Sequence, residues 1–452
     1  MSNNFRDADR LTPYLMPPSI NEWLPEGHLA RFVVEIVGQL DLTSIKGAYS
    51  GGGSKPYPPA MLLSLLFYGY ATGTFSSRRL ERSTYDSVAC RYISANTHPD
   101  HDTIANFRKR FLVELEELFV QILQIARLMK VFKLGKIALD GTKIHANASK
   151  HHAFSWKHAC NIEKQLKEEV CQLMRWAENA DNKDIPDGLD IPEELLRREV
   201  RLKALSDAKV EIERRAAEKF AEAKLEYEQK LVKRKAIEKK GKKIRGKKPK
   251  EPVSGPSDKD QVNLTDSESR IMPLAGGGFE QSYNAQACVD IETMLIVENH
   301  ITQKSNDKKE IKPALEALAA LPSELGTVDD ILADAGYFSK SNVELCEKEN
   351  INPFISTHRE KHNLTFEQRL SKPLEPIPDN ADAVTQMRHR MKTDEGRALY
   401  SKRKSTVEPV FGIIKAVMGF RQFLLRGIKA VRGEWNLVCI AWNLKKIHAL
   451  TS

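Results

Sequence analysis

The chain contains few cysteines and no cysteine pairing motif. Among its 452 residues there are 6 cysteines, without a Cys-x2-Cys pair. This pattern favours reduced thiols and argues against a disulfide scaffold or a zinc ribbon. Four potential zinc ligands lie close together but lack the spacing of a tetrahedral site; they are His151, His152, His158 and Cys160.

Long hydrophobic runs are also missing. The longest uncharged apolar run, "AMLLSLLFYGYA" at 60–71, has 12 residues, whereas a membrane-spanning helix needs about 20. The chain also shows no charged-then-apolar amino-terminal signal. We therefore expect a cytoplasmic protein with no membrane partner. At 452 residues the chain is too long for one ordinary core, so two or three domains are expected.

Positive charge is concentrated in one tract. The formal net charge is +9, yet residues 231–250 hold eleven Lys or Arg against one Glu, which leaves −1 for the rest of the chain. Such a tract is either a solvated, flexible segment or an arm that lies along nucleic-acid phosphates.

The first 130 residues have a helical pattern. After "PDHD", apolar residues recur at spacings of three and four from Ile104 to Ile125, which predicts an amphipathic helix. Arg108 lies on the polar side of this pattern, and Arg78 and Arg79 follow a serine that can cap a short helix. These helices fit a helix-turn-helix-like DNA-binding domain, and they also fit a plain bundle with a charged exterior.

Strand patterns begin at residue 131. The segment "KIALDGTKIHANA" alternates apolar and small residues around Asp140-Gly141, which predicts a strand, a turn and a second strand. Further strands are expected at 283–290, 294–301 and 328–334, with helices at 308–321 and 339–349. Strands mixed with helices predict an α/β domain.

A highly charged helical segment interrupts this α/β domain. From 155 to about 250 a narrow apolar stripe, which includes Leu205 and Ile212, is typical of a helical hairpin or coiled coil. A linker rich in Pro, Gly, Ser and Lys follows it. The predicted organisation is a helical domain (1–130), a first α/β part (131–154), the inserted arm with its linker (155–258) and a second α/β part (259–452).

Three acids occupy suggestive positions in the α/β parts. Asp140 and Asp334 each end a predicted strand, and Glu408 precedes Pro409 in "TVEPVFGIIK". A proline fits only the first turn of a helix, so a helix is expected to start near Thr406. Taken singly, these acids read as a turn residue and helix caps.

Taken together, the three acids predict a metal site. Carboxylates at one edge of a sheet repel one another unless cations neutralise them. Hard oxygen ligands select Mg²⁺ or Mn²⁺. Two such ions can drive the in-line displacement of a phosphodiester.

The combination of motifs resembles the DDE transposases of bacterial insertion sequences. The matching segments are "ALDGTK", "ADAGYFS", "VEPVFGIIK", "NLTDSESRIM", "GFEQSYNAQACVD", "PYPPAMLLSLLFYGYATG" and "HPDHDTIANFRKRF". The resemblance implies a ribonuclease H-like catalytic domain with Asp140, Asp334 and Glu408 as its acids. It also implies a protein that cuts terminal inverted repeats and transfers 3′-hydroxyl ends to target DNA. We therefore expect DNA as the partner rather than a small molecule, at least a dimer on DNA, and association with the bacterial nucleoid.

Many relatives carry Tyr-x2-Arg-x3-Glu-x6-Lys around the third acid. Here Tyr400, Arg403, Glu408 and Lys415 fit, except that Arg403 is one residue too far from Glu408 and Lys404 takes the three-residue spacing. The resemblance makes Lys415, Arg403, Lys404 and Tyr400 candidate DNA contacts, and Lys143 is a further candidate. A hydrolytic nuclease and an inactive DNA-binding regulator remain alternatives.

Overall fold

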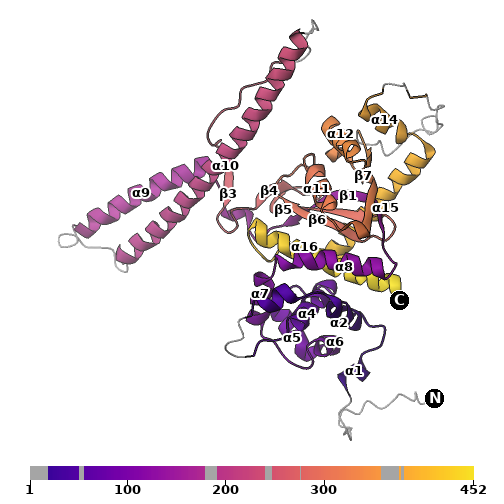
Figure 1. Cartoon of the computed structure of the whole chain (residues 1–452). Helices are drawn as coiled ribbons and strands as arrows, with labels where there is room; N and C mark the ends of the chain where they lie inside the picture. Colours follow the sequence, from indigo (N-terminus) through magenta and orange to yellow (C-terminus); the bar gives the residue numbers. More distant parts are fainter. Residues whose placement is uncertain are drawn as a thin grey trace, which may run out of the picture.

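A six-stranded mixed β-sheet forms the centre of the molecule in the computed structural model (Figure 1). The structure describes residues 19–49, 55–178, 191–239, 247–274, 276–357, 376–377 and 381–452. The expected mixed α/β architecture is confirmed. The strands are β1 (Leu134–His145), β4 (Arg270–Pro273), β5 (Phe279–Asp290), β6 (Ile296–Thr302), β7 (Gly326–Ala333) and β8 (Asn352–Ile355).

Strand β1 lies in the middle of the sheet. It pairs antiparallel with β5 on one side and parallel with β7 on the other, and β8 continues the parallel side. The opposite edge of β5 is shared, since β6 pairs with its carboxyl-terminal part and β4 with its amino-terminal part. Two of these strands, β4 and β8, were not predicted from the sequence.

The predicted turn at Asp140-Gly141 was wrong, because β1 runs straight through it. The pairing with β5 is uninterrupted from Ile137 opposite Asp290 to His145 opposite Ser282. Gly141 is needed within the strand because a Cβ atom there would lie 2.1 Å from Nε2 of the buried Gln286. The glycine therefore serves a close approach between neighbouring strands.

The predicted helix start near Thr406 was also wrong. Helix α15 (Asp394–Ala416) begins twelve residues earlier, where the Thr393 side chain accepts a hydrogen bond from the Gly396 amide, and Pro409 lies inside it. The missing proline N–H would have bonded the carbonyl of Ser405. Ser405 is exposed, so water can satisfy that carbonyl, while the buried stripe through Val407, Val410 and Ile414 continues the helix.

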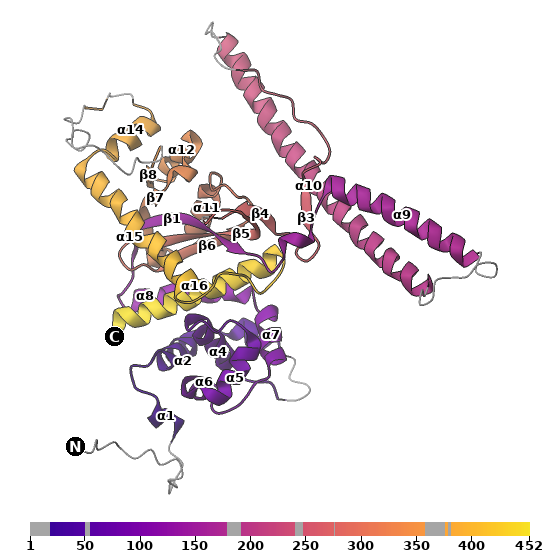
Figure 2. The ribbon, with the colours of Figure 1, turned by 180° about the vertical axis from the view of Figure 1, so that it is seen from behind.

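The other helices of this part are spread around the sheet. Figures 1 and 2 show α11 and α12 on the opposite side of the sheet from α16. They are α11 (Ile311–Ala319), α12 (Lys340–Lys348), α14 (Ala383–Arg390) and α16 (Ile428–Thr451).

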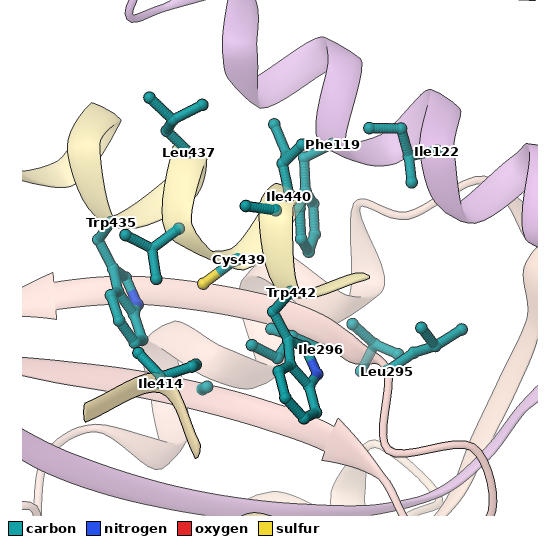
Figure 3. Packing of buried hydrophobic residues seen from close by; sticks show 14 of the residues in the cluster. Phe119, Ile122, Leu295, Ile296, Ile414, Trp435, Leu437, Cys439, Ile440 and Trp442 are labelled. Carbon is teal, nitrogen blue, oxygen red and sulfur yellow. The ribbon is translucent and has the colours of Figure 1, made fainter. Parts of the chain in front are cut away.

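The carboxyl-terminal helix α16 joins the sheet to the amino-terminal helices. It packs against β6 on one side and against α2, α4 and α8 on the other. In Figure 3, Trp435 and Trp442 point from α16 toward the sheet, and Phe119 and Ile122 of α8 lie across from it. The amino-terminal helices are α1 (Ile20–Trp23), α2 (Leu29–Gln39), α3 (Thr43–Gly47), α4 (Pro59–Ala71), α5 (Ser77–Asp86), α6 (Val88–Ile93), α7 (His101–Arg110) and α8 (Glu114–Leu128).

The inserted segment projects away from the body (Figures 1 and 2). Helix α9 (Trp156–Glu178) packs on the first part of α10 (Ile191–Lys239) around Ala159, Leu166 and Leu205. A two-stranded sheet of β2 (Ala153–Ser155) and β3 (Gln261–Asn263) closes its base. Part of the basic tract, residues 240–246, lies outside the described residues.

Two expectations from composition can be compared with the structure. All six cysteines are free thiols, as predicted. Within the described ranges, none of the helices combines the length and the apolarity that a membrane span requires.

Candidate active site

Two neighbouring parallel strands bring Asp140 and Asp334 together. The pairing of β1 with β7 ends at Leu139 opposite Ala333, and each of these residues is followed by one of the acids. Neighbouring strands lie about 4.8 Å apart. The two aspartates therefore stand side by side where the parallel pair ends, although Asp140 itself lies in the middle of β1.

Helix α15 supplies Glu408 and, one turn earlier, Arg403. The guanidinium of Arg403 donates from Nη2 to Glu408 Oε1 at 2.9 Å and from Nη1 to Asp140 Oδ2 at 3.3 Å. The side chain is only 7% exposed. Arg403 thus links the strand acid Asp140 to the helix acid Glu408, and the charge of Asp334 also acts on it.

The surroundings of Asp140 oppose its negative charge. Burial raises the pKa of this carboxyl to about 7, although the Gly141 amide and Arg403 act in the opposite direction. The nearby carboxylates of Asp334 and Asp307 contribute to the raised pKa of Asp140. Burial would lower the pKa of Arg403, but Asp140 and the other acids around it outweigh burial and raise that pKa. The acids around Asp140 therefore carry more negative charge than the guanidinium of Arg403 alone neutralises.

Lys415 lies two turns beyond Glu408 and reaches the next part of β1. Its Nζ donates to the Lys143 carbonyl at 2.9 Å and to the Thr142 hydroxyl. Burial, together with the nearby charge of Lys143, lowers the pKa of Lys415. Lys415 is thereby held against β1 at the residues that follow Asp140 and Gly141.

A fourth carboxylate, Asp307, was not singled out from the sequence. It lies in the loop between β6 and α11 and accepts hydrogen bonds from Asn284 (2.6 Å), Gln286 (2.8 Å) and Lys143 (3.3 Å). The sequence signal that points to it is weak, since Asp307 is a lone acid a few residues after a predicted strand. Its proximity to Asp140 depends on β5, which lies in the sheet between β1, which carries Asp140, and β6, which precedes the Asp307 loop.

The donor set suits a hard divalent cation, but the acids are not yet arranged around one. Within the described part of the chain, no group of three or more His, Cys, Asp and Glu side chains is positioned to hold a metal ion. Carboxylate oxygens are the ligands that Mg²⁺ prefers. Arg403 occupies the space between Asp140 and Glu408, so the residues fit such an ion once this guanidinium turns away.

The remaining residues predicted to contact DNA differ in their exposure and in their contacts. Lys404 is exposed, while the Tyr400 hydroxyl donates to the Ala333 carbonyl at 3.4 Å. Arg403 is a cation that contacts Asp140 and Glu408 directly. Arg78 and Arg79 are exposed on α5.

The expectation that Arg108 lies on an outer face was wrong. Arg108 is 6% exposed and donates to the Tyr70 hydroxyl at 2.9 Å and to the Phe75 carbonyl at 3.0 Å. Tyr70 in turn contacts the buried Glu434 of α16 at 3.2 Å. The arginine is buried because it offsets a buried carboxylate.

A cleft of about 870 Å³ lies between α10 and the loop that carries Asp307. Cations outnumber acids along it; the basic residues are Arg215, Lys219, Lys259, Arg270, Lys304, Lys308 and Lys309. Lys309 also bonds Glu222 of α10 at 2.6 Å, which ties the arm to the body. Such a surface favours a polyanion.

Comparisons with protein families match both ends of the chain. A family model described as "Transposase DDE domain" matches residues 357–448, and another described as a transposase domain matches residues 18–110. The first range contains Arg403, Glu408 and Lys415, and the second contains α1 to α7. No curated protein and no solved structure matches the chain. Transposase models thus match both ends of the chain, which indicates a DDE transposase of an insertion sequence.

Proposed function

We propose that the protein cuts DNA at the terminal inverted repeats of its own element and transfers the 3′-hydroxyl ends to target DNA. The observation that carries the proposal is that Arg403 links Asp140 to Glu408, while Asp334 follows the strand paired beside Asp140. Acids held this close need cations, and in phosphoryl transfer the protein's main task is to position charge.

The strand order supports a ribonuclease H-like catalytic domain. Three antiparallel strands, β6, β5 and β1, are followed by the parallel strands β7 and β8. In α/β sheets the ends of central parallel strands are a preferred place for active-site residues. Asp140 and Asp334 each follow the last residue of the parallel pairing between β1 and β7.

The acids would hold two Mg²⁺ ions, for which Mn²⁺ can substitute. Bound ions of this kind supply activation of the attacking water or 3′-hydroxyl and stabilisation of the leaving oxygen. The chain's own groups orient the DNA. Lys415, fixed against β1, places a positive charge two turns from Glu408, and Arg403 is free to bind a phosphate once it leaves the carboxylates.

DNA would extend over several other basic surfaces. The exposed Arg78 and Arg79 of α5, the cleft beside α10 and the basic tract of the arm are all suited to phosphates. Because two element ends must be paired, the active form would be at least a dimer on DNA. The arm is the proposed place of contact between protomers.

The test is a cleavage and joining assay with Mg²⁺ and DNA that ends in the inverted repeats flanking the gene. The wild-type protein is expected to nick the ends and to join pre-cut ends to a plasmid. Asp140→Asn, Asp334→Asn and Glu408→Gln should each reduce cleavage at least a thousandfold. Asp329→Asn, at an exposed position on β7, serves as the matched control.

The outcomes separate the alternatives. Shortened ends without joined products would indicate a hydrolytic nuclease. Specific DNA binding without any cleavage would indicate an inactive regulator. Full cleavage by the three acid variants would overturn the site assignment.

A further inference from the structure

The carboxylate of Asp307 lies close to β1 at Gly141, the residue after the proposed catalytic acid Asp140. A Cβ atom on Gly141, the residue after Asp140, would stand 2.8 Å from Asp307 Oδ1. The negative charge of Asp307 also contributes to the raised pKa of Asp140. A carboxylate of strand β1 and a carboxylate of the β6–α11 loop thus lie close to each other.

The hydrogen bonds to Asp307 all fall on one oxygen. Lys143 Nζ, Asn284 Nδ2 and Gln286 Nε2 donate to Oδ1, and Oδ2 receives no hydrogen bond from any described residue. The side chain remains 22% exposed. This is the arrangement of a ligating carboxylate, in which the protein holds one oxygen and leaves the other for the ion.

Asn284 gives an independent indication of a missing ligand. It is completely buried, and its Nδ2 donates to Asp307 and to the Lys304 carbonyl. Its Oδ1 is buried and has no hydrogen-bond partner among the described residues. Buried polar atoms are nearly always paired, so this oxygen, on the carboxamide that touches Asp307, calls for a donor that the described residues do not supply.

We propose that Asp307 is a fourth carboxylate of the metal centre, with Oδ2 as a ligand and Asn284 Oδ1 as an acceptor for a water of the ion's hydration shell. The inference rests on the proposed function, because it adds a residue to the site of Asp140. The ion is a hard divalent cation, since every contributed atom is an oxygen. Lys143 stands in for its charge in the metal-free protein.

The experiment measures Mn²⁺ binding to the full-length, metal-stripped protein by electron paramagnetic resonance, with no DNA present. Asp307→Asn is expected to weaken binding at least tenfold, while the matched control Asp329→Asn leaves it unchanged. Asp140→Asn and Asp334→Asn are measured in parallel. If these two bind Mn²⁺ normally, the proposed function fails. If they lose binding while Asp307→Asn keeps it, only the fourth carboxylate is overturned.

A second variant separates a metal ligand from a simple loop anchor. Lys143→Gln removes the cation that neutralises Asp307 and should tighten Mn²⁺ binding several-fold, because a competing positive charge is lost. If Asp307 only anchors its loop, Lys143→Gln lowers the melting temperature in EDTA and leaves Mn²⁺ affinity unchanged. That result would overturn the proposal even if Asp307→Asn failed to fold.

Discussion

Burial of the Asp140 carboxylate costs the metal-free protein folding free energy when this group is ionised. Its pKa rises from 3.8 to about 7 because the carboxyl is buried. A raised pKa means that the folded protein holds a proton that the unfolded chain releases. Stability is therefore lost as pH increases between these two values.

Replacing Asp140 with Asn should remove this pH dependence. Between about pH 4 and pH 8, we expect Asp140→Asn to gain up to about 4 kcal/mol of unfolding free energy relative to wild type, since the variant has no carboxyl to ionise. Urea unfolding in EDTA at both pH values measures the difference. An equal stability difference at the two pH values would show that Asp140 ionises without cost.

Arg403 acts as the internal counterion of the acids. Arg403→Gln should lower the unfolding free energy of the metal-free protein by about 3 kcal/mol at pH 8, because it leaves the largely buried carboxylate of Asp140 without its guanidinium partner. Added Mg²⁺ should restore part of the loss by taking the place of the guanidinium.

Thermal unfolding with and without Mg²⁺ checks this expectation, with the exposed neighbour variant Lys404→Gln as the control. If Mg²⁺ does not reduce the loss of stability in Arg403→Gln, the ion does not bind where the guanidinium of Arg403 lies.

The three acids were predicted from the sequence because each follows an apolar strand or lies on an apolar helix. The carboxylate partners of the buried arginines could not be predicted in this way. Arg108 and Arg403 look like surface residues in the sequence, yet each is buried because a carboxylate distant in the chain, Glu434 or Asp140, lies opposite. Asp307 was missed because its place beside the other acids depends on β5, whose residues Asn284 and Gln286 donate hydrogen bonds to it.

At the scale of elements, pairing and packing override local signals. Asp-Gly favours a turn, but β1 has partners on both sides and continues through it. Pro409 favours a helix start, but the buried stripe of α15 on both sides of the proline keeps the helix intact. The types and order of most elements were therefore predictable, whereas these boundaries depended on neighbours far along the chain.

A mostly buried histidine, His300, joins β6 to the start of α11. His300 contacts Glu298 Oε1 at 2.7 Å and Glu310 Oε2 at 3.3 Å. Burial would lower the pKa of His300, but the two carboxylates outweigh it and raise the pKa to about 9. The stabilisation is complete below about pH 6.5 and disappears as pH rises through about 9.

His300→Gln should abolish this pH dependence. Relative to the variant, wild type is expected to lose about 3 kcal/mol of unfolding free energy between about pH 6 and pH 10. Urea unfolding across this range tests it, and the exposed His151→Gln should behave like wild type. A pH profile of His300→Gln that matches wild type would contradict the assignment.

At the scale of the whole molecule, one core connects regions that are far apart in the sequence. The buried cluster extends from the amino-terminal helices to the sheet through α16. The Arg108, Tyr70 and Glu434 network crosses the same junction. Movement of the amino-terminal helices relative to the acids would have to break this core, whereas the described residues of the arm pack in separate buried clusters around Leu205 and Ile212.

The basic tract of the arm should contribute to DNA affinity through counterion release. The triple change Lys247→Gln, Lys248→Gln and Lys250→Gln should reduce the slope of log affinity against log salt by about 3, because each phosphate contact contributes about 0.9. Fluorescence anisotropy with a repeat-ended duplex measures the slope.

The control changes three exposed lysines of α11 and α12 in the same way, Lys312→Gln, Lys340→Gln and Lys348→Gln. An unchanged slope for the arm variant would assign the tract to a role other than phosphate binding.

The most direct test of the central claim is an anomalous difference map from crystals of the protein soaked in Mn²⁺. The account predicts manganese peaks bonded to Asp140 and Asp334, with Glu408 joining them and Arg403 displaced. Crystals that contain Mn²⁺ only at other places, with Arg403 still bridging Asp140 and Glu408, would contradict it.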